Sequence, residues 1–175
     1  MLFRSKCVGV FGKLLIIDSK SNSIDHIALR NRLSYFGKYR RLKYYVEPEM
    51  FGKANVWYSI FKKSYLKNTR IENITHDYEL IYNLLSVGDI LSCEECYLKK
   101  RVVYESESYS LIESNKKITI LITIKYKTQF FIETFLMYYS NSKSLEKLII
   151  FLLSPIKLLF DLYLTLLSRK INKVK

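Results

Sequence analysis

Glycine, proline and cysteine are scarce in this chain of 175 residues, and each shortage argues against a class of protein. It has five glycines, two prolines and 49% hydrophobic residues, which argues against general disorder. Its three cysteines are an odd number without a dense framework, which argues against a disulfide-rich secreted domain. We expect a single folded domain over residues 1–175, and a reducing, cytoplasmic location.

The sequence also lacks the motifs that mark common catalytic sites. It has no P-loop, no dinucleotide fingerprint and no H-E-x-x-H metalloprotease pattern. His76 and Asp77 are adjacent, which in a strand places them on opposite faces, and no Gly-flanked serine nucleophile accompanies them. We therefore favour a protein that is not an enzyme over an enzyme whose site is assembled from scattered residues, and we expect no catalytic residues, no metal and no cofactor.

Residues 93–96 read CEEC, a C-x-x-C spacing that serves redox exchange or half of a zinc site. There is no second C-x-x-C, and only Cys7 and the two histidines could complete a metal site. The two intervening carboxylates are expected to raise the pKa of both thiols, which opposes thiolate formation. We interpret Cys93 and Cys96 as ordinary thiols near a strand.

Basic residues are in excess, and they are placed unevenly. The formal net charge is +13; residues 1–70 hold fifteen Lys/Arg against four Asp/Glu, residues 71–113 three against nine, and residues 114–175 eleven against three. Basic ends around an acidic middle fit contact with an anionic membrane surface or with nucleic acid. Ordinary surface charge is the other explanation.

The densest basic segment, residues 30–45, also carries aromatic residues. Cations contact phosphates, and aromatic rings stack on bases or sit among lipid headgroups, so this segment is the strongest candidate for an anionic contact surface. An ordinary strand with one aromatic face is the alternative. The candidate contact residues are Arg30, Arg32, Tyr35, Lys38, Tyr39, Arg40, Arg41 and Lys43.

Residues 145–170, LEKLIIFLLSPIKLLFDLYLTLLSRK, predict a long helix with a narrow polar stripe and a very wide apolar face. Such a helix needs a sheet, a second helix or a lipid surface to cover it. Pro155 should kink it or divide it. The polar stripe comprises Lys147, Ser154, Lys157, Asp161, Thr165, Ser168 and Arg169.

The same helix is long enough to cross a bilayer, since residues 148–167 number twenty. The favourable insertion free energy of its apolar residues, about −0.5 kcal/mol each, is nearly cancelled by the unfavourable insertion of Lys157 and Asp161 at about +3 kcal/mol each. Insertion into the membrane is therefore marginal. We favour packing on a sheet over lying in or crossing a membrane. The residues expected to contact an apolar ligand or a membrane are Phe151, Ile156, Leu159, Phe160 and Tyr163.

The remaining elements are predicted mostly as strands. Alternating Ile and Thr or Lys over residues 118–127 indicates a strand with one face towards a core. Residues 55–65 and 130–139 fit either a helix or a strand. Further strands are expected over residues 7–17, 78–85 and 101–112, and one more begins at Ile90. Turns are expected over residues 18–23 and at Gly88-Asp89, and a short helix over residues 24–36.

From Val87 onward the order VGDILSCEECYLKKRVVYESESYSLIESNKKITILITIKY, followed by the apolar helix, resembles the C-terminal half of START-like or polyketide-cyclase-like helix-grip families. The resemblance rests on successive antiparallel strands, the Gly88-Asp89 turn, the hairpin into Ile118–Tyr126 and the terminal helix. It implies a helix folded across a sheet, with an apolar cavity between them for a lipid or isoprenoid and usually no metal.

These observations predict an α+β fold in which an antiparallel sheet is covered by the long C-terminal helix, as in helix-grip proteins. The predicted function is non-catalytic binding of a lipid-like ligand or association with an anionic membrane surface. One alternative is a nucleic-acid-binding protein that uses residues 30–45. Another is a small membrane-anchored accessory or immunity-type protein whose C-terminal helix spans the bilayer.

Overall fold

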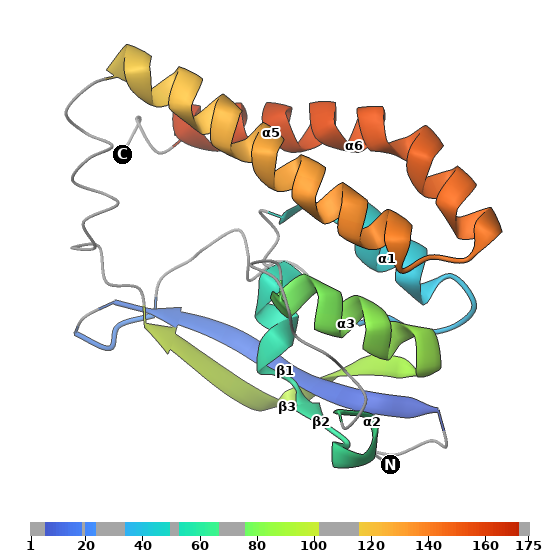
Figure 1. Ribbon diagram of the computed structural model, residues 1–175. Helices are drawn as coiled ribbons and strands as arrows, with labels where there is room; N and C mark the ends of the chain where they lie inside the picture. Colours follow the sequence, from blue (N-terminus) through green and yellow to red (C-terminus); the bar gives the residue numbers. More distant parts are fainter. Residues whose placement is uncertain are drawn as a thin grey trace.

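A computed structural model of the chain describes residues 6–18, 20–23, 34–49, 53–66, 76–101 and 116–171, and its architecture is α+β (Figure 1). The strands are β1 (Cys7–Ile17), β2 (Ile60–Phe61) and β3 (Asp89–Arg101), in the order β2-β1-β3. β1 is antiparallel to β2 but parallel to β3. The prediction of a wholly antiparallel sheet is therefore wrong, because the chain between β1 and β3 is a long crossover that contains helices.

The helices are α1 (Arg40–Val46), the 3₁₀ helix η3 (Lys53–Tyr58), α2 (Lys63–Leu66), α3 (His76–Val87), α5 (Lys116–Ser140) and α6 (Ser144–Ile171). All but the short α2, which follows β2 at the edge of the sheet, are arranged in two layers above the sheet (Figure 1). α3 contacts β1 and β3, whereas α5 and α6 pack on each other and on α3 and α1. The long helices thus form the layer farthest from the sheet.

The C-terminal helix is confirmed, but its predicted position on the sheet is wrong. α6 packs mainly on α5 and also on α1, because the two long helices are joined by a short turn and can cover each other directly. α6 remains one helix through Pro155. Figure 1 shows its two halves running in different directions, as expected where proline removes a backbone donor inside a helix.

The predicted strand over 118–127 is wrong, since these residues lie in α5. No glycine or proline interrupts residues 116–140, so the helix runs on through the segment that fitted either structure. The helical penalty for Ile and Thr is a few tenths of a kcal/mol per residue, and tertiary packing overrides it. The second strand of the hairpin that carried part of the helix-grip resemblance, Ile118–Tyr126, is therefore helical.

The predicted strand over 78–85 is also wrong, because these residues form most of α3. Its buried side chains Leu80, Ile81, Leu84 and Leu85 recur at helical spacing. Asp77 lies in the first turn of the helix, where a carboxylate interacts favourably with the helix dipole. The helix ends at Val87, and the turn predicted at Gly88 leads directly into β3.

The predictions for the remaining segments are partly confirmed. The strand over 7–17 and the strand from Ile90 are confirmed as β1 and β3, and Asp18 closes the predicted turn by accepting hydrogen bonds from Asn22. Segment 55–65 contains the end of η3, then β2 and most of α2. The predicted helix over 24–36 is wrong at its end, where Tyr35 pairs with Ile90 as a β-bridge. Residues 24–33 and 102–112, with Arg30, Arg32 and most of the strand predicted over 101–112, lie outside the described residues.

Tyrosine rings fill the space between the sheet-side helices and the outer layer. Tyr138 of α5 makes edge-to-face contacts with Tyr44, Tyr45 and Tyr82, at ring-centroid distances of 6.3, 5.1 and 4.7 Å. Such contacts add about 1 kcal/mol each beyond the area they bury. They fix α5 against α1 and α3, and so position the long helices.

Candidate functional site: the α5–α6 layer

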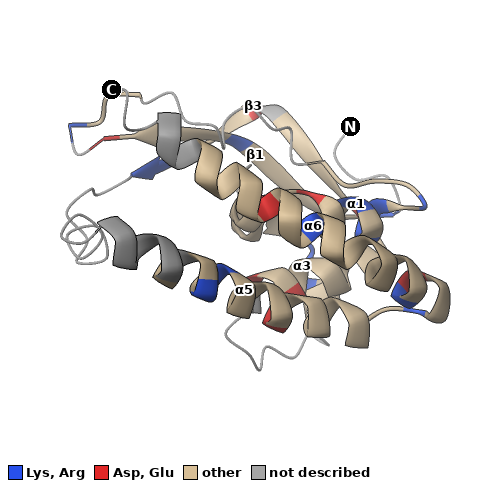
Figure 2. Ribbon diagram, turned by 90° about the horizontal axis from the view of Figure 1, so that it is seen from above, with Lys and Arg blue, Asp and Glu red and all other residues tan. Residues whose placement is uncertain are grey.

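The outer face of α6 is uniformly apolar. All exposed side chains between Leu145 and Leu167 are aliphatic, aromatic or proline, and at 100° per residue they cover about half of the circumference over roughly 33 Å. Figure 2 looks down on this layer and shows that most of the α6 ribbon belongs to uncharged residues. The outer face comprises Leu145, Leu148, Phe151, Leu152, Pro155, Ile156, Leu159, Phe160, Tyr163, Leu166 and Leu167.

The charged and hydroxyl-bearing side chains of α6 from Glu146 to Thr165, Tyr163 excepted, point inward or are partly covered, and their contacts run along the helix. Arg41 donates to Glu146 over 2.6 Å, near the first turn. Tyr45 and Ser154 share a hydrogen bond of 2.7 Å between their hydroxyl groups. One turn further on, the Lys157 ammonium binds Asp161 at 2.8 Å and donates to the backbone carbonyl of Glu47 at 3.3 Å. α6 is therefore inverted relative to a surface helix of a water-soluble protein.

A buried group of charges lies beneath the middle of α6. Lys157 is 3.8 Å from the Glu49 carboxylate, which is itself 3.5 Å from the Lys53 ammonium. These two lysines hold the pKa of Glu49 below its usual value against the opposing effect of burial, which is the larger single influence. Pairing in this interior is required, because an unpaired buried charge is very costly.

Lys53 is enclosed by aromatic rings. Its ammonium lies 4.4, 4.9 and 5.6 Å from the ring centroids of Tyr44, Tyr138 and Tyr78. Burial lowers the pKa of Lys53 to about 8, although Glu49 opposes the shift. Burial also raises the pKa of the Tyr44 and Tyr138 hydroxyls. The ring faces and one carboxylate thus hold a cation that carries little water.

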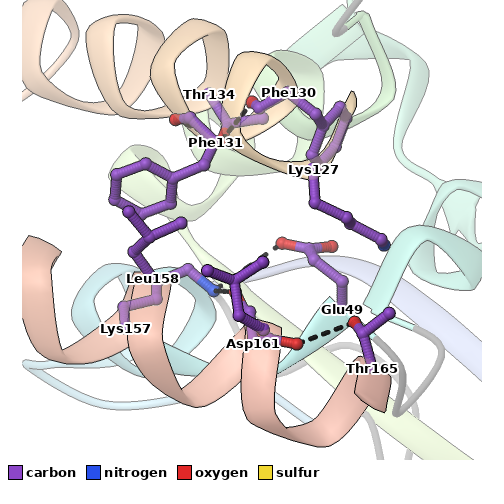
Figure 3. Close-up of a pocket in the computed structure, with 10 residues that line it drawn as sticks. Glu49, Lys127, Phe130, Phe131, Thr134, Lys157, Leu158, Asp161 and Thr165 are labelled. Atoms are coloured by element: carbon purple, nitrogen blue, oxygen red, sulfur yellow. Dashed lines mark hydrogen bonds and ion pairs between the residues drawn. The ribbon is translucent and has the colours of Figure 1, made fainter. Parts of the chain in front are cut away.

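A pocket opens between α5 and α6 beside these charges (Figure 3). Lys127 and Thr134 of α5 line it together with Lys157 and Asp161 of α6 and with Glu49. Its volume is about 20 Å³, which is room for one water molecule. Apolar side chains from both helices complete the lining, namely Phe130, Phe131, Leu158 and Leu162. The pocket is too small for a lipid-like ligand.

The five residues predicted to contact a ligand or a membrane all belong to the outer face. Ile156 and Leu159 are 65% and 68% exposed, and the three aromatic members are exposed as well. None of them lines the pocket between α5 and α6. Their position leaves contact with an external apolar phase or with another macromolecule.

The basic aromatic segment is divided between the interior and the surface. Arg41 is buried, with its guanidinium 4.0 Å from the centroid of the Tyr82 ring. Arg40 donates to the carbonyls of Leu85 and Ser86 at the end of α3 and lies 3.5 Å from Asp89. Both arginines hold the fold together in this structure.

The rest of the segment is nearer to solvent. Tyr35 is buried, whereas Phe36, Lys38, Tyr39 and Lys43 are exposed. Of the residues predicted to contact an anion, Lys38, Tyr39 and Lys43 therefore remain on the described surface. We call Phe36, Lys38, Tyr39 and Lys43 the basic surface patch.

Sequence reasoning missed the partners of the polar stripe. No local pattern singled out Glu47-Pro48-Glu49, yet this segment supplies a carboxylate and a carbonyl to Lys157. The alignment of Lys157 and Asp161 with Ser154 was the available signal. A stripe of this kind needs polar partners whenever the opposite face meets an apolar phase.

The C-x-x-C pair departs from its interpretation in one respect. The pKa of Cys93 is lowered, first by its hydrogen bond with Cys96 and then by the backbone, whereas the pKa of Cys96 is raised. Glu95 raises both values as expected, but at Cys93 the hydrogen bonds outweigh it. Within the described part of the chain, no three His, Cys, Asp or Glu side chains gather in a way that could hold a metal ion.

Ser144–Leu167, 24 residues, is long and apolar enough to cross a membrane. A core helix of a water-soluble protein passes the same test, but it is mostly buried, whereas 17% of this window is buried. Comparison of the chain with protein-family models, with curated proteins and with solved structures finds no match. The helix-grip resemblance therefore stays a prediction.

Proposed function

We propose that this protein is a membrane-surface protein that lies on a lipid bilayer through the outer face of α6. The observation that carries the proposal is the inversion of this helix. Every charged or hydroxyl-bearing side chain between Leu145 and Leu167 except Tyr163 is turned inward or partly covered. Every exposed side chain in the same range is apolar or aromatic. A hydrocarbon phase on the outer side explains both halves of this pattern.

A lipid surface fits this face better than a protein partner does. Protein interfaces carry about one hydrogen bond per 100–200 Å² and a polar rim. Over about 33 Å of helix, the outer face offers one polar side-chain group, the Tyr163 hydroxyl. Tyrosine is itself typical of the boundary between headgroups and hydrocarbon.

The contacts of α6 favour an orientation parallel to the membrane. Arg41, Tyr45 and Glu49 bind the helix at Glu146, Ser154 and Lys157. The folded body therefore lies alongside α6 instead of at one end. If α6 crossed the bilayer in this conformation, the body would enter the hydrocarbon, so the helix lies in the plane of the surface.

The basic surface patch adds an electrostatic contribution on anionic membranes. Exposed Lys38 and Lys43 attract anionic headgroups by about 1 kcal/mol each near the surface. This contribution is screened by salt, whereas the apolar contact is not. Binding to neutral vesicles should therefore persist at high salt, and binding to anionic vesicles should be stronger at low salt.

The decisive test replaces two outer-face residues. Full burial of an aliphatic side chain is worth about 1.5–3 kcal/mol, so the two-thirds exposed Ile156 and Leu159 should together contribute about 3 kcal/mol to membrane binding. The double variant Ile156→Ser/Leu159→Ser should then bind phosphatidylcholine vesicles on the order of a hundredfold more weakly. Vesicle flotation measures the partition coefficient.

The matched control is Ile60→Ser, because Ile60 is 77% exposed but lies on the edge of the sheet. Its partition coefficient should equal that of the unaltered protein. Unchanged flotation of the double variant would refute the proposal, as would unaltered protein that never floats with vesicles. Resistance of bound protein to a carbonate wash would show that α6 spans the membrane instead of lying on it.

A further inference from the structure

On the side of the molecule away from α6, β1 and β3 pair irregularly (Figure 1). Gly12 is paired with Cys93, but the next residue, Lys13, is paired with Tyr97. One step along β1 thus corresponds to four along β3. Three residues, 94–96, are extra and form a large bulge between the two cysteines of the C-x-x-C sequence.

The bulge brings together two thiols that a regular strand would separate. In an extended strand, residues three apart are about 10 Å from each other and point to opposite faces. Cysteines at that separation cannot be bridged without backbone movement. Here the sulfur atoms of Cys93 and Cys96 lie 3.2 Å apart. The bulged backbone therefore already places the two cysteines close enough for a disulfide.

Gly12 makes room for this arrangement. A Cβ atom at this position would lie 3.0 Å from the carbonyl oxygen of Cys96 and 3.3 Å from its carbonyl carbon. The backbone of the bulge therefore passes directly over a residue without a side chain, as is common where two backbones approach closely. The strand opposite the thiols is adapted to the bulge.

The two thiols are accessible and they differ from each other. Cys96 is exposed and Cys93 partly exposed, whereas Cys7 is buried, with its thiol donating to the carbonyl of Gly9. The lowered pKa of Cys93 and the raised pKa of Cys96 are the asymmetry expected of an attacking and a resolving thiol.

We propose that Cys93 and Cys96 form a reversible dithiol–disulfide site that exchanges with small disulfides of the class R–S–S–R. The Cys93 thiolate attacks one sulfur of the disulfide, the S–S bond breaks, and one R–S⁻ leaves, which gives a mixed disulfide. Cys96 then gives its proton to solvent and attacks the Cys93 sulfur, and the second R–S⁻ leaves. The two cysteines lose two electrons, and R–S–S–R is reduced to two thiols.

The test uses the full-length protein and oxidised glutathione as the probe. The unaltered protein should lose two hydrogen atoms and gain no adduct, and proteolytic mapping should find the Cys93–Cys96 disulfide. Cys96→Ser should instead retain one glutathione on Cys93. Cys93→Ser should react several-fold more slowly than Cys96→Ser, because backbone hydrogen bonds still lower the pKa of Cys93 when Cys96 is replaced, whereas burial and Glu95 still raise the pKa of Cys96 when Cys93 is replaced. Intact mass spectrometry follows all three reactions.

Two further variants serve as controls. Cys7→Ser should behave like the unaltered protein, because Cys7 lies outside the pair. Gly12→Ala keeps both thiols but crowds the bulge, so it should slow disulfide closure and accumulate the mixed disulfide. Two stable glutathione adducts on the unaltered protein, or equal rates for the two single cysteine variants, would overturn the proposal.

Discussion

Replacement of Arg41 by alanine should weaken the attachment of the α5–α6 layer to the rest of the fold. The Arg41 side chain connects α1 to the turn between the two long helices. It binds Glu146 at 2.6 Å and also donates to the backbone carbonyl of Asn141. Its guanidinium covers the ring of Tyr82 at 4.0 Å. All of these contacts are lost at once in Arg41→Ala.

The expected cost follows from the burial of this ion pair. Loss of one partner from a buried pair costs about 3–5 kcal/mol. The Glu146 side chain is 23% exposed, so water compensates part of the loss, and we expect a decrease of about 3 kcal/mol in the free energy of unfolding. With a urea slope near 2 kcal/mol/M, the midpoint should fall by about 1.5 M. The urea midpoint of Arg41→Lys should lie between those of the unaltered protein and Arg41→Ala, because lysine keeps the positive charge but not the planar guanidinium group.

Urea denaturation followed by circular dichroism measures these changes. Lys38→Ala is the control, because Lys38 is an exposed neighbour and should shift the free energy of unfolding by less than about 0.5 kcal/mol. An Arg41→Ala variant as stable as this control would show that Arg41 faces solvent. That result would return Arg41 to the surface available to an anionic partner.

Two further predictions concern stability. The pKa of Lys53 is about 8 in the folded protein against 10.5 in the unfolded chain, so the unfolded chain binds more protons between these pH values. The free energy of unfolding should therefore rise by on the order of 2 kcal/mol from pH 8 to about pH 10. Above pH 10 it should fall, because tyrosines ionise once unfolded while buried Tyr44 and Tyr138 resist; a flat melting-temperature profile would contradict this. Gly88→Ala should cost at least about 2 kcal/mol in urea denaturation, since its Cβ would lie 2.3 Å from the Lys6 carbonyl oxygen. Gly37→Ala, with φ +80° but open space around it, should cost about 1 kcal/mol; equal costs would refute the steric argument.

Local patterns identified the elements whose signals are unambiguous. The apolar run of residues 7–17 predicted β1, and the break at Gly88-Asp89 marked the boundary between α3 and β3. The length and composition of residues 145–170 predicted α6. In each case short-range periodicity and turn chemistry suffice, because no competing structure buries the same residues equally well.

The sequence left α5 open to a wrong assignment for a physical reason. Alternating Ile and Thr over residues 118–124 satisfies the period of a strand, and intrinsic preferences differ by less than about 1 kcal/mol per residue. Packing against α6 outweighs that preference. The four-residue spacing of the buried leucines in α3, by contrast, was present in the sequence and could have been recognised.

What the sequence determined about α6 was that one side is polar and the other apolar; what it could not determine was which side faces the protein. Helical periodicity is the same whether the apolar side is inside or outside. The direction is set by residues about a hundred positions earlier: Arg41 binds Glu146, and Tyr45 and Glu49 meet the polar stripe at Ser154 and Lys157. The bulge that joins Cys93 and Cys96 likewise depends on Gly12 in another strand. Both candidate sites are therefore products of long-range pairing, which short-range sequence patterns do not encode.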